Sequence, residues 1–404
     1  MKLILINLLS FILTIYIAAI IVFKQYYFNN THIINAALLI IFIILMFYEK
    51  KQKYKINAII VTYAFFVIIA LASSLWGIDF DNPSYKALQL FVIFINMFII
   101  YNLVKKYNLI NTFFNGVLLG SLINYLIMFH IIQVPFEIYS GSGLGARAVG
   151  TMGNPNILTT AMLMSMLVSM IYLFRDKKMN ILFYYYQYIN IFLAIYLIVL
   201  TVSKKGIILG SLLFIAYFIL LLRNKKGILQ ISVMTIIGIF LVQFFIDKVE
   251  LYALLEYVQR RFDNFATGLT SINTTASAAS STAIRAKLIE FGLVTFQESP
   301  LIGYGLDNFR VLTGTHYAHN TPVELLVGVG LVGLIVYYSM HFFLLQKIYR
   351  MQQSELKYLL YFFILSILLM DLTTVSYGSK LILFAMVYIS IVAESEKADY
   401  TENK

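Results

Sequence analysis

Residues 154–178 read NPNILTTAMLMSMLVSMIYLFRDKK. The twenty residues 155–174 carry no charge, which is the length and composition of a helix that crosses a membrane. Asn154 is suited to cap the start of this helix, and Pro155 is suited to its first position. Arg175, Lys177 and Lys178 follow its end, as is typical of the cytoplasmic side of a span. This segment therefore predicts a membrane helix and its direction.

The composition extends this prediction to the whole chain. Of its 404 residues, 61% are apolar or aromatic and 12% are charged, against ~25% charged in a typical soluble domain. A soluble enzyme of this length could not cover so much apolar surface. The absence of cysteine excludes a disulfide scaffold, a thiolate nucleophile and a cysteine metal site. We therefore predict an all-α, polytopic transmembrane helix bundle, and we attribute the net charge of +11 to membrane topology rather than to nucleic acid binding.

The same length and composition test predicts twelve spans in a single integral membrane domain, 1–404. They are Leu3–Phe23, Ile33–Tyr48, Ile56–Leu75, Tyr85–Val104, Leu109–Ile132, Pro155–Phe174, Met179–Leu200, Gly206–Leu222, Ile228–Ile246, Pro322–Leu345, Tyr358–Thr373 and Thr374–Val392. With the N-terminus in the cytoplasm, 18 of the 30 lysines and arginines fall on the inner side. We therefore expect a multi-pass protein with both termini in the cytoplasm.

The two longest segments between spans, 133–154 and 247–321, both lie outside in this topology. The larger one is expected to be an extracytoplasmic loop of 75 residues that carries the active site. The cytoplasmic loops are short, and the sequence contains no glycine-rich loop that would cradle phosphates. Chemistry on the outer face without ATP or a nucleotide sugar follows from this arrangement.

Several outer cations are candidates for binding an anion. Arg147 precedes the start of the sixth span, and a helix start next to a cation favours an anion, although Arg147 could also simply solvate its loop. Lys204 and Lys205 lie between spans seven and eight, where they could attract an anionic headgroup or snorkel to the interface. Arg260 and Arg261 end an amphipathic helix predicted between Leu251 and Phe265, where they could bind a ligand or complement the helix dipole.

The end of the large loop contains the candidate base. Arg285 lies near the start of a second predicted helix, a position where a cation is tolerated if an anion lies nearby. Residues 321–324, TPVE, match a capping box with Thr321 as N-cap, and His319 and Asn320 immediately precede it. His319 is suited to general base chemistry near neutral pH; His316 is its rival, and loop hydrogen bonding is the alternative role. No third ligand accompanies these two histidines, so we expect no metal.

Two stretches resemble the O-antigen ligase/polymerase family, which includes the Wzy-type polysaccharide repeat-unit polymerases. Residues 285–309 read RAKLIEFGLVTFQESPLIGYGLDNF, and residues 319–333 read HNTPVELLVGVGLVG. They match the family's arginine at a helix start, its "PllGxGxxnF" turn, and its His-Asn before an apolar helix with Glu and paired Gly. GNPN at 153–156 and SKKG at 203–206 extend a looser similarity over 145–335, with lysine where the family often has arginine.

The resemblance implies a GT-C-type helical fold and an inverting glycosyltransferase without a cofactor. Its donor would be an undecaprenyl-diphosphate-linked oligosaccharide, used at the outer face of the bacterial cytoplasmic membrane. Arg147 and Arg285 would bind the diphosphate, and His319 would act as base or position the acceptor. Asn320, Lys204, Lys205, Arg260 and Arg261 would bind substrate.

Within the family, we favour a polymerase of O-antigen or capsule repeat units over a ligase that transfers glycan to lipid A core or another acceptor. The expected partners are the lipid-linked glycan, the bilayer, and possible chain-length regulator and flippase proteins, with no nucleic acid. A polysaccharide transporter or flippase is the alternative from another class. Such a protein would be expected to show charges in mid-span and repeated halves, and neither is evident in this sequence.

Overall fold

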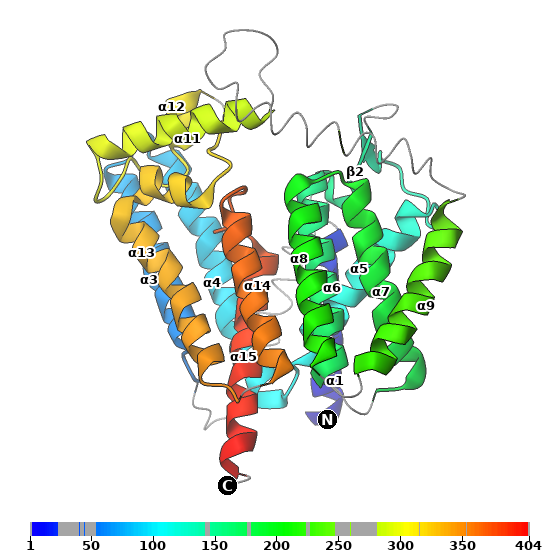
Figure 1. The fold of residues 1–404 in the computed structure, drawn as a ribbon. Helices are drawn as coiled ribbons and strands as arrows, with labels where there is room; N and C mark the ends of the chain where they lie inside the picture. Colours follow the sequence, from blue (N-terminus) through cyan, green and yellow to red (C-terminus); the bar gives the residue numbers. More distant parts are fainter. Residues whose placement is uncertain are drawn as a thin grey trace. The chain divides into compact units, whose positions relative to one another are not determined.

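The computed structural model describes residues 2–22, 40, 44, 54–141, 146–175, 179–223, 227–246, 259, 281–314, 316–352 and 354–402, and these residues are mostly helical (Figure 1). The chain divides into two compact units. Unit 1 comprises Met1–Ile41, Leu109–Asp263 and Gln353–Phe363, and unit 2 comprises Phe42–Asn108, Asn264–Gln352 and Ile364–Lys404. We describe each unit by itself.

Unit 1 is a bundle of apolar helices. Its helices are α1 (Lys2–Val22), α5 (Asn111–Met128), α6 (Pro155–Arg175), α7 (Ile181–Leu200), α8 (Lys204–Leu222) and α9 (Gly227–Ile246). The glycine at 116 lets α5 approach α1 closely, since a Cβ atom there would lie 2.6 Å from the Cβ atom of Ile17. Gly206 lets α8 approach α6 in the same way, because its Cβ would lie 2.1 Å from Cγ2 of Thr159. Small residues at these positions therefore allow close helix packing.

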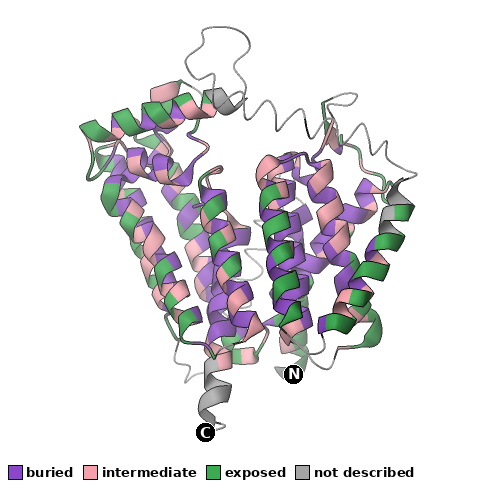
Figure 2. Ribbon diagram, viewed as in Figure 1, coloured by how far each residue is buried: buried purple, intermediate pink, exposed green. Residues whose placement is uncertain are grey.

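Unit 2 contains a second helix bundle with a helix lying across it. Its elements are α3 (Ala58–Ala72), η1 (Ser73–Leu75), α4 (Asp81–Tyr107), α11 (Ser281–Glu298), α12 (Phe309–Thr313), α13 (Thr321–Tyr349) and α15 (Lys380–Glu402). Helix α11 lies across the end at which α13 begins (Figure 1). Every residue in 381–393 of α15 is buried, so the last helix of the chain is the core of this unit (Figure 2). Helix α14 (Glu355–Asp371) contributes its first part to unit 1 and its last part to unit 2.

The described helices confirm an all-α polytopic membrane protein. Seven are long and apolar enough to cross a membrane, and two shorter apolar segments, Ile6–Val22 and Gly227–Phe240, accompany them. The seven are Ala58–Leu75, Asp81–Tyr107, Asn111–Met128, Pro155–Arg175, Ile181–Leu200, Lys204–Leu222 and Thr321–Tyr349. The predicted span Ile33–Tyr48 lies outside the described residues except for Ile40 and Ile44. The total of twelve spans remains a prediction.

The last two predicted spans form helices with a longer turn than expected. Asp371 ends α14, but α15 begins at Lys380 rather than at Thr374. The N–H groups of Thr373 and Thr374 both donate to the Met370 carbonyl, which ends α14 and starts the turn. The prediction of a start at Thr374 was therefore wrong by six residues.

Helix α13 is broken at Gly330, where φ is 63° and ψ is −166°. The turn SPLIGYG, residues 299–305, docks against this break and pairs with the backbone groups that the break releases. The N–H of Tyr304 donates to the Val327 carbonyl (2.8 Å), and the N–H of Leu331 donates to the Pro300 carbonyl (2.9 Å). The turn at residues 299–305 and the break in α13 at Gly330 therefore stabilise each other through backbone hydrogen bonds.

Candidate functional site

Arg147 is positioned in unit 1 by a short hairpin. Strand β2 (Arg147–Ala148) pairs antiparallel with β1 (Tyr139–Ser140), and Arg147 lies opposite Ser140. From this strand, Nε of Arg147 donates to the Thr201 carbonyl at 2.9 Å, in the turn between α7 and α8. This hydrogen bond brings Arg147 close to the start of α8, where Lys204 and Lys205 are the first two helical residues.

The starts of α6 and α8 lie side by side at the same place. The hydroxyl of Ser203, the N-cap residue of α8, donates to Oδ1 of Asn156 at 3.0 Å. The hydroxyls of Thr159 and Thr201 lie 2.7 Å apart. Two helix N-termini, each with positive partial charge, therefore meet beside the Arg147 side chain, and Lys204 and Lys205 are the first residues of one of them. This arrangement favours an anionic group such as a diphosphate.

His319 lies in unit 2, immediately before α13, on a loop with an unusual backbone. Its φ is 54°, in the left-handed region that residues with a side chain rarely adopt. The imidazole ring lies 3.9 Å from the ring of Tyr317, centroid to centroid. On the same aromatic ring, the guanidinium of Arg310 lies 5.7 Å from the centroid, and Arg310 also pairs with Asp307 at 3.6 Å. The candidate base is thus accompanied by an arginine that we did not single out from the sequence.

The start of α13 differs from the predicted capping box. The N-cap is Asn320, whose side-chain oxygen accepts a hydrogen bond from the Val323 N–H at 3.0 Å. Thr321 is already helical, and its hydroxyl donates to the Thr374 carbonyl (2.7 Å) instead of capping. The carboxylate of Glu324 reaches back to the Ala318 N–H at 2.8 Å. The prediction of Thr321 as N-cap was wrong by one residue.

The predicted substrate contact Asn320 also ties the loop to the turn after α14. Its Nδ2 donates to the Leu372 carbonyl at 3.1 Å. Behind it, the buried carboxylate of Asp371 accepts hydrogen bonds from the hydroxyls of Ser376 and Tyr338. An ionisable group buried in a membrane helix commonly serves a function, and here the group supports the turn that holds the start of α13.

Arg285 lies on α11, which packs against the same end of α13. The helix begins at Ser281, so Arg285 is half-buried in its second turn rather than at its start. Gly292 makes the contact possible, since a Cβ there would lie 2.4 Å from Cγ1 of Val323. Leu288 completes a small core with Phe309 and the start of α13. Helix α11 is therefore anchored to the helix that follows His319.

The predicted site residues fall into two groups, one in each unit. Arg147, Lys204 and Lys205 come together in unit 1, whereas Arg285, His319 and Asn320 lie in unit 2. Arg260 and Arg261 lie outside the described residues, as does their predicted amphipathic helix except for Gln259. Arg310 was missed, although its place three residues after Asp307 is a helical ion-pair spacing that the sequence does display. Within the described part of the chain, no three His, Asp or Glu side chains are grouped so as to hold a metal.

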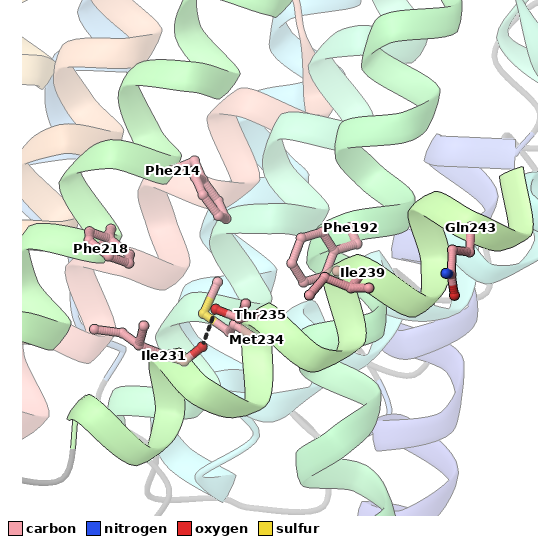
Figure 3. A pocket seen from close by; sticks show the side chains of 9 residues that line it. Phe192, Phe214, Phe218, Ile231, Met234, Thr235, Ile239 and Gln243 are labelled. Carbon is pink, nitrogen blue, oxygen red and sulfur yellow. Dashed lines mark hydrogen bonds between the residues drawn. The ribbon is translucent and has the colours of Figure 1, made fainter. Parts of the chain in front are cut away.

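An apolar groove opens between α7, α8 and α9 of unit 1 (Figure 3). Its volume is about 420 Å³. The aromatic rings of Phe192, Phe214 and Phe218 form one wall, and α9 supplies the other, with Met234 and Ile239 among its residues. A groove of this composition suits a hydrocarbon chain and offers no acid or base for chemistry.

Comparison with known protein families gives a match over part of the chain. A family model described as O-Antigen ligase matches residues 189–338. The match runs from within α7 into α13, and it includes His319, Arg285 and the lysine pair but not Arg147. No curated protein matches the chain.

Proposed function

We propose that this chain, which matches a family model described as O-Antigen ligase over residues 189–338, belongs to the O-antigen ligase/polymerase family and polymerises lipid-linked oligosaccharide repeat units of a surface polysaccharide. The donor in this proposal is an undecaprenyl-diphosphate-linked glycan, used at the outer face of the cytoplasmic membrane. The observation that carries the proposal is the convergence of Arg147 and the lysine pair with the starts of α6 and α8.

The proposed reaction is a single inverting displacement. A hydroxyl of the acceptor sugar attacks the anomeric carbon of the donor, and His319 takes the hydroxyl proton. The bond between the anomeric carbon and the diphosphate oxygen breaks, and both of its electrons leave with the lipid diphosphate. Cations and helix N-termini stabilise the charge that develops on this leaving group, so it needs no protonation. The isoprenoid chain of the donor is proposed to lie in the apolar groove of α7, α8 and α9.

Ligase activity is the second candidate, because the matching family model carries that description. Deletion of the gene followed by sizing of the surface glycan separates the two. Single repeats on the final acceptor mean that a polymerase was lost, whereas long lipid-linked polymer without transfer means that a ligase was lost. An unchanged glycan profile contradicts both activities.

Three substitutions test the residue roles in the same cells. His319→Ala, Arg285→Ala and Arg147→Ala are each expected to lower product formation by about 100-fold or more, since general base and charge-stabilising groups contribute on this scale. His316→Ala is the matched control, because His316 is an exposed histidine three residues from His319. Wild-type glycan from His319→Ala, with membrane levels of protein unchanged, would show that His319 is not the base.

A further inference from the structure

Glu324 is a carboxylate buried in the first turn of α13, with 1% of its surface exposed. One of its oxygens accepts the Ala318 N–H at 2.8 Å. The other, Oε1, is buried and has no hydrogen-bond partner among the described residues. An acid in the first turn of a helix commonly offsets the helix dipole, or closes a capping box by accepting the N–H of the N-cap residue. Here the side chain instead reaches back past the N-cap residue into the loop.

The residue that Glu324 holds is the immediate neighbour of His319. Ala318 is fully buried, so its N–H is shielded from water and the hydrogen bond to Glu324 satisfies it. On the opposite side of His319, the Asn320 side chain is tied to the Leu372 carbonyl at 3.1 Å. His319 is therefore the single left-handed residue between two fixed neighbours, and its backbone conformation determines where the imidazole lies.

We propose that Glu324 is a positioning residue for His319. It acts through the Ala318 N–H to hold the left-handed turn at His319, and its hydrogen-bonding capacity matters rather than its charge. This proposal rests on the proposed function, in which His319 takes the acceptor proton. A displacement of about 1 Å between reacting groups can cost about 100-fold in rate, so loosening one side of the loop is expected to slow the chemical step.

Two conservative substitutions separate hydrogen bonding from charge. Glu324→Gln keeps the side-chain length and an oxygen that can accept the Ala318 N–H, but it removes the charge. Glu324→Asp keeps the charge in the first turn but shortens the side chain by one methylene, which withdraws the acceptor from Ala318. Purified full-length protein in lipid nanodiscs, with a synthetic polyprenyl-diphosphate oligosaccharide as donor, gives kcat and KM for each variant.

We expect Glu324→Gln to retain kcat within about threefold, and Glu324→Asp to lose about 10- to 100-fold in kcat with little change in donor KM. Hydrogen exchange of the peptide that contains Ala318 provides a readout independent of activity. Exchange is expected to be slow in the wild type and in Glu324→Gln, and faster in Glu324→Asp. Glu355→Ala is the matched control, because Glu355 is likewise an acid in the first turn of a helix, α14.

Three outcomes would overturn the proposal. If Glu324→Asp is active and Glu324→Gln is not, charge rather than hydrogen bonding is what matters. If both variants match the wild type while His319→Ala is inactive, Glu324 does not position the base and the proposed function stands. If His319→Ala is as active as the wild type, the proposed role of His319 fails, and the positioning role fails with it.

Discussion

Replacing Gly330 by alanine tests the connection between the break in α13 and the turn that docks on it. A Cβ atom at Gly330 would lie 2.2 Å from the carbonyl carbon and the carbonyl oxygen of Leu301. The backbone angles at this position, 63° and −166°, also belong to a region that is essentially restricted to glycine. Alanine must therefore either strain the break or straighten the helix and expel the turn.

The expected cost follows from these two effects. An unfavourable backbone conformation costs about 1–3 kcal/mol, and overpacking of a tight contact costs a further amount of about 1–3 kcal/mol. Expulsion of the turn has a cost in the same range, because it gives up four backbone hydrogen bonds at about 1 kcal/mol each. At about 2–4 °C per kcal/mol for a unit of this size, Tm is expected to fall by about 4–24 °C.

The chain provides its own reporter for this experiment, since Trp76 is its only tryptophan. The indole Nε1 donates to the Ile302 carbonyl at 3.1 Å, within the docked turn. Intrinsic fluorescence of the detergent-solubilised protein therefore follows both unfolding and release of the turn. The Gly330→Ala protein is expected to show a lower Tm and a red-shifted emission maximum before heating.

Gly378→Ala is the matched control in the same unit. A Cβ there would meet its nearest neighbour, Cδ2 of Leu90, at an ordinary 3.7 Å, so a change in Tm below about 2 °C is expected. If Gly330→Ala matches this control in Tm and in emission maximum, the break does not hold the turn, and our explanation of the paired motifs is refuted.

Two further predictions concern the groove and the inner end of unit 2. Ile239→Trp narrows the groove and is expected to raise donor KM about 3- to 10-fold with kcat unchanged. The control Ile236→Trp, on an exposed part of α9 outside the groove, should leave KM unchanged. Equal donor KM values for the two variants would show that the lipid chain does not bind in the groove. Glu394 lies beyond the predicted span 374–392; burial would raise its pKa, but hydrogen bonds from Lys105 and Lys347 outweigh burial and lower it. The ionised Glu394 side chain therefore stabilises the fold fully above its unfolded-state pKa of about 4.3, and this stabilisation is lost as pH falls through its lower folded-state pKa. Tm should drop over this pH range in the wild type, and it should drop less in Glu394→Gln.

The positions of the helices could be predicted from the sequence because the membrane demands long apolar runs. The helix starting at Pro155, for example, is evident from an uncharged run with a proline at its start and cations at its end. The break at Gly330 could not be predicted in this way. A glycine in an apolar helix is compatible with continuous helix, and only the turn at 299–305, distant in sequence, makes the break favourable.

The site shows the same division between local and distant information. His319 and the cations were identified by residue type and by their place next to helix starts. The N-cap of α13 is Asn320 rather than Thr321. The Thr321 hydroxyl donates instead to the carbonyl of Thr374, which is more than fifty residues away in sequence. Likewise, Arg147 meets the start of α8 through the Thr201 carbonyl, and no local pattern indicates that contact.

The central place of α15 has a consequence for how the protein is made. Residues 381–393 are the core of unit 2, yet they follow the other described helices of this unit in the sequence and are therefore synthesised after them. Helices α4 and α13 must therefore stay in the membrane without their common packing partner until α15 has been synthesised. A stop codon between α14 and α15 would leave unit 2 without its core helix, and membrane quality control would be expected to degrade the product.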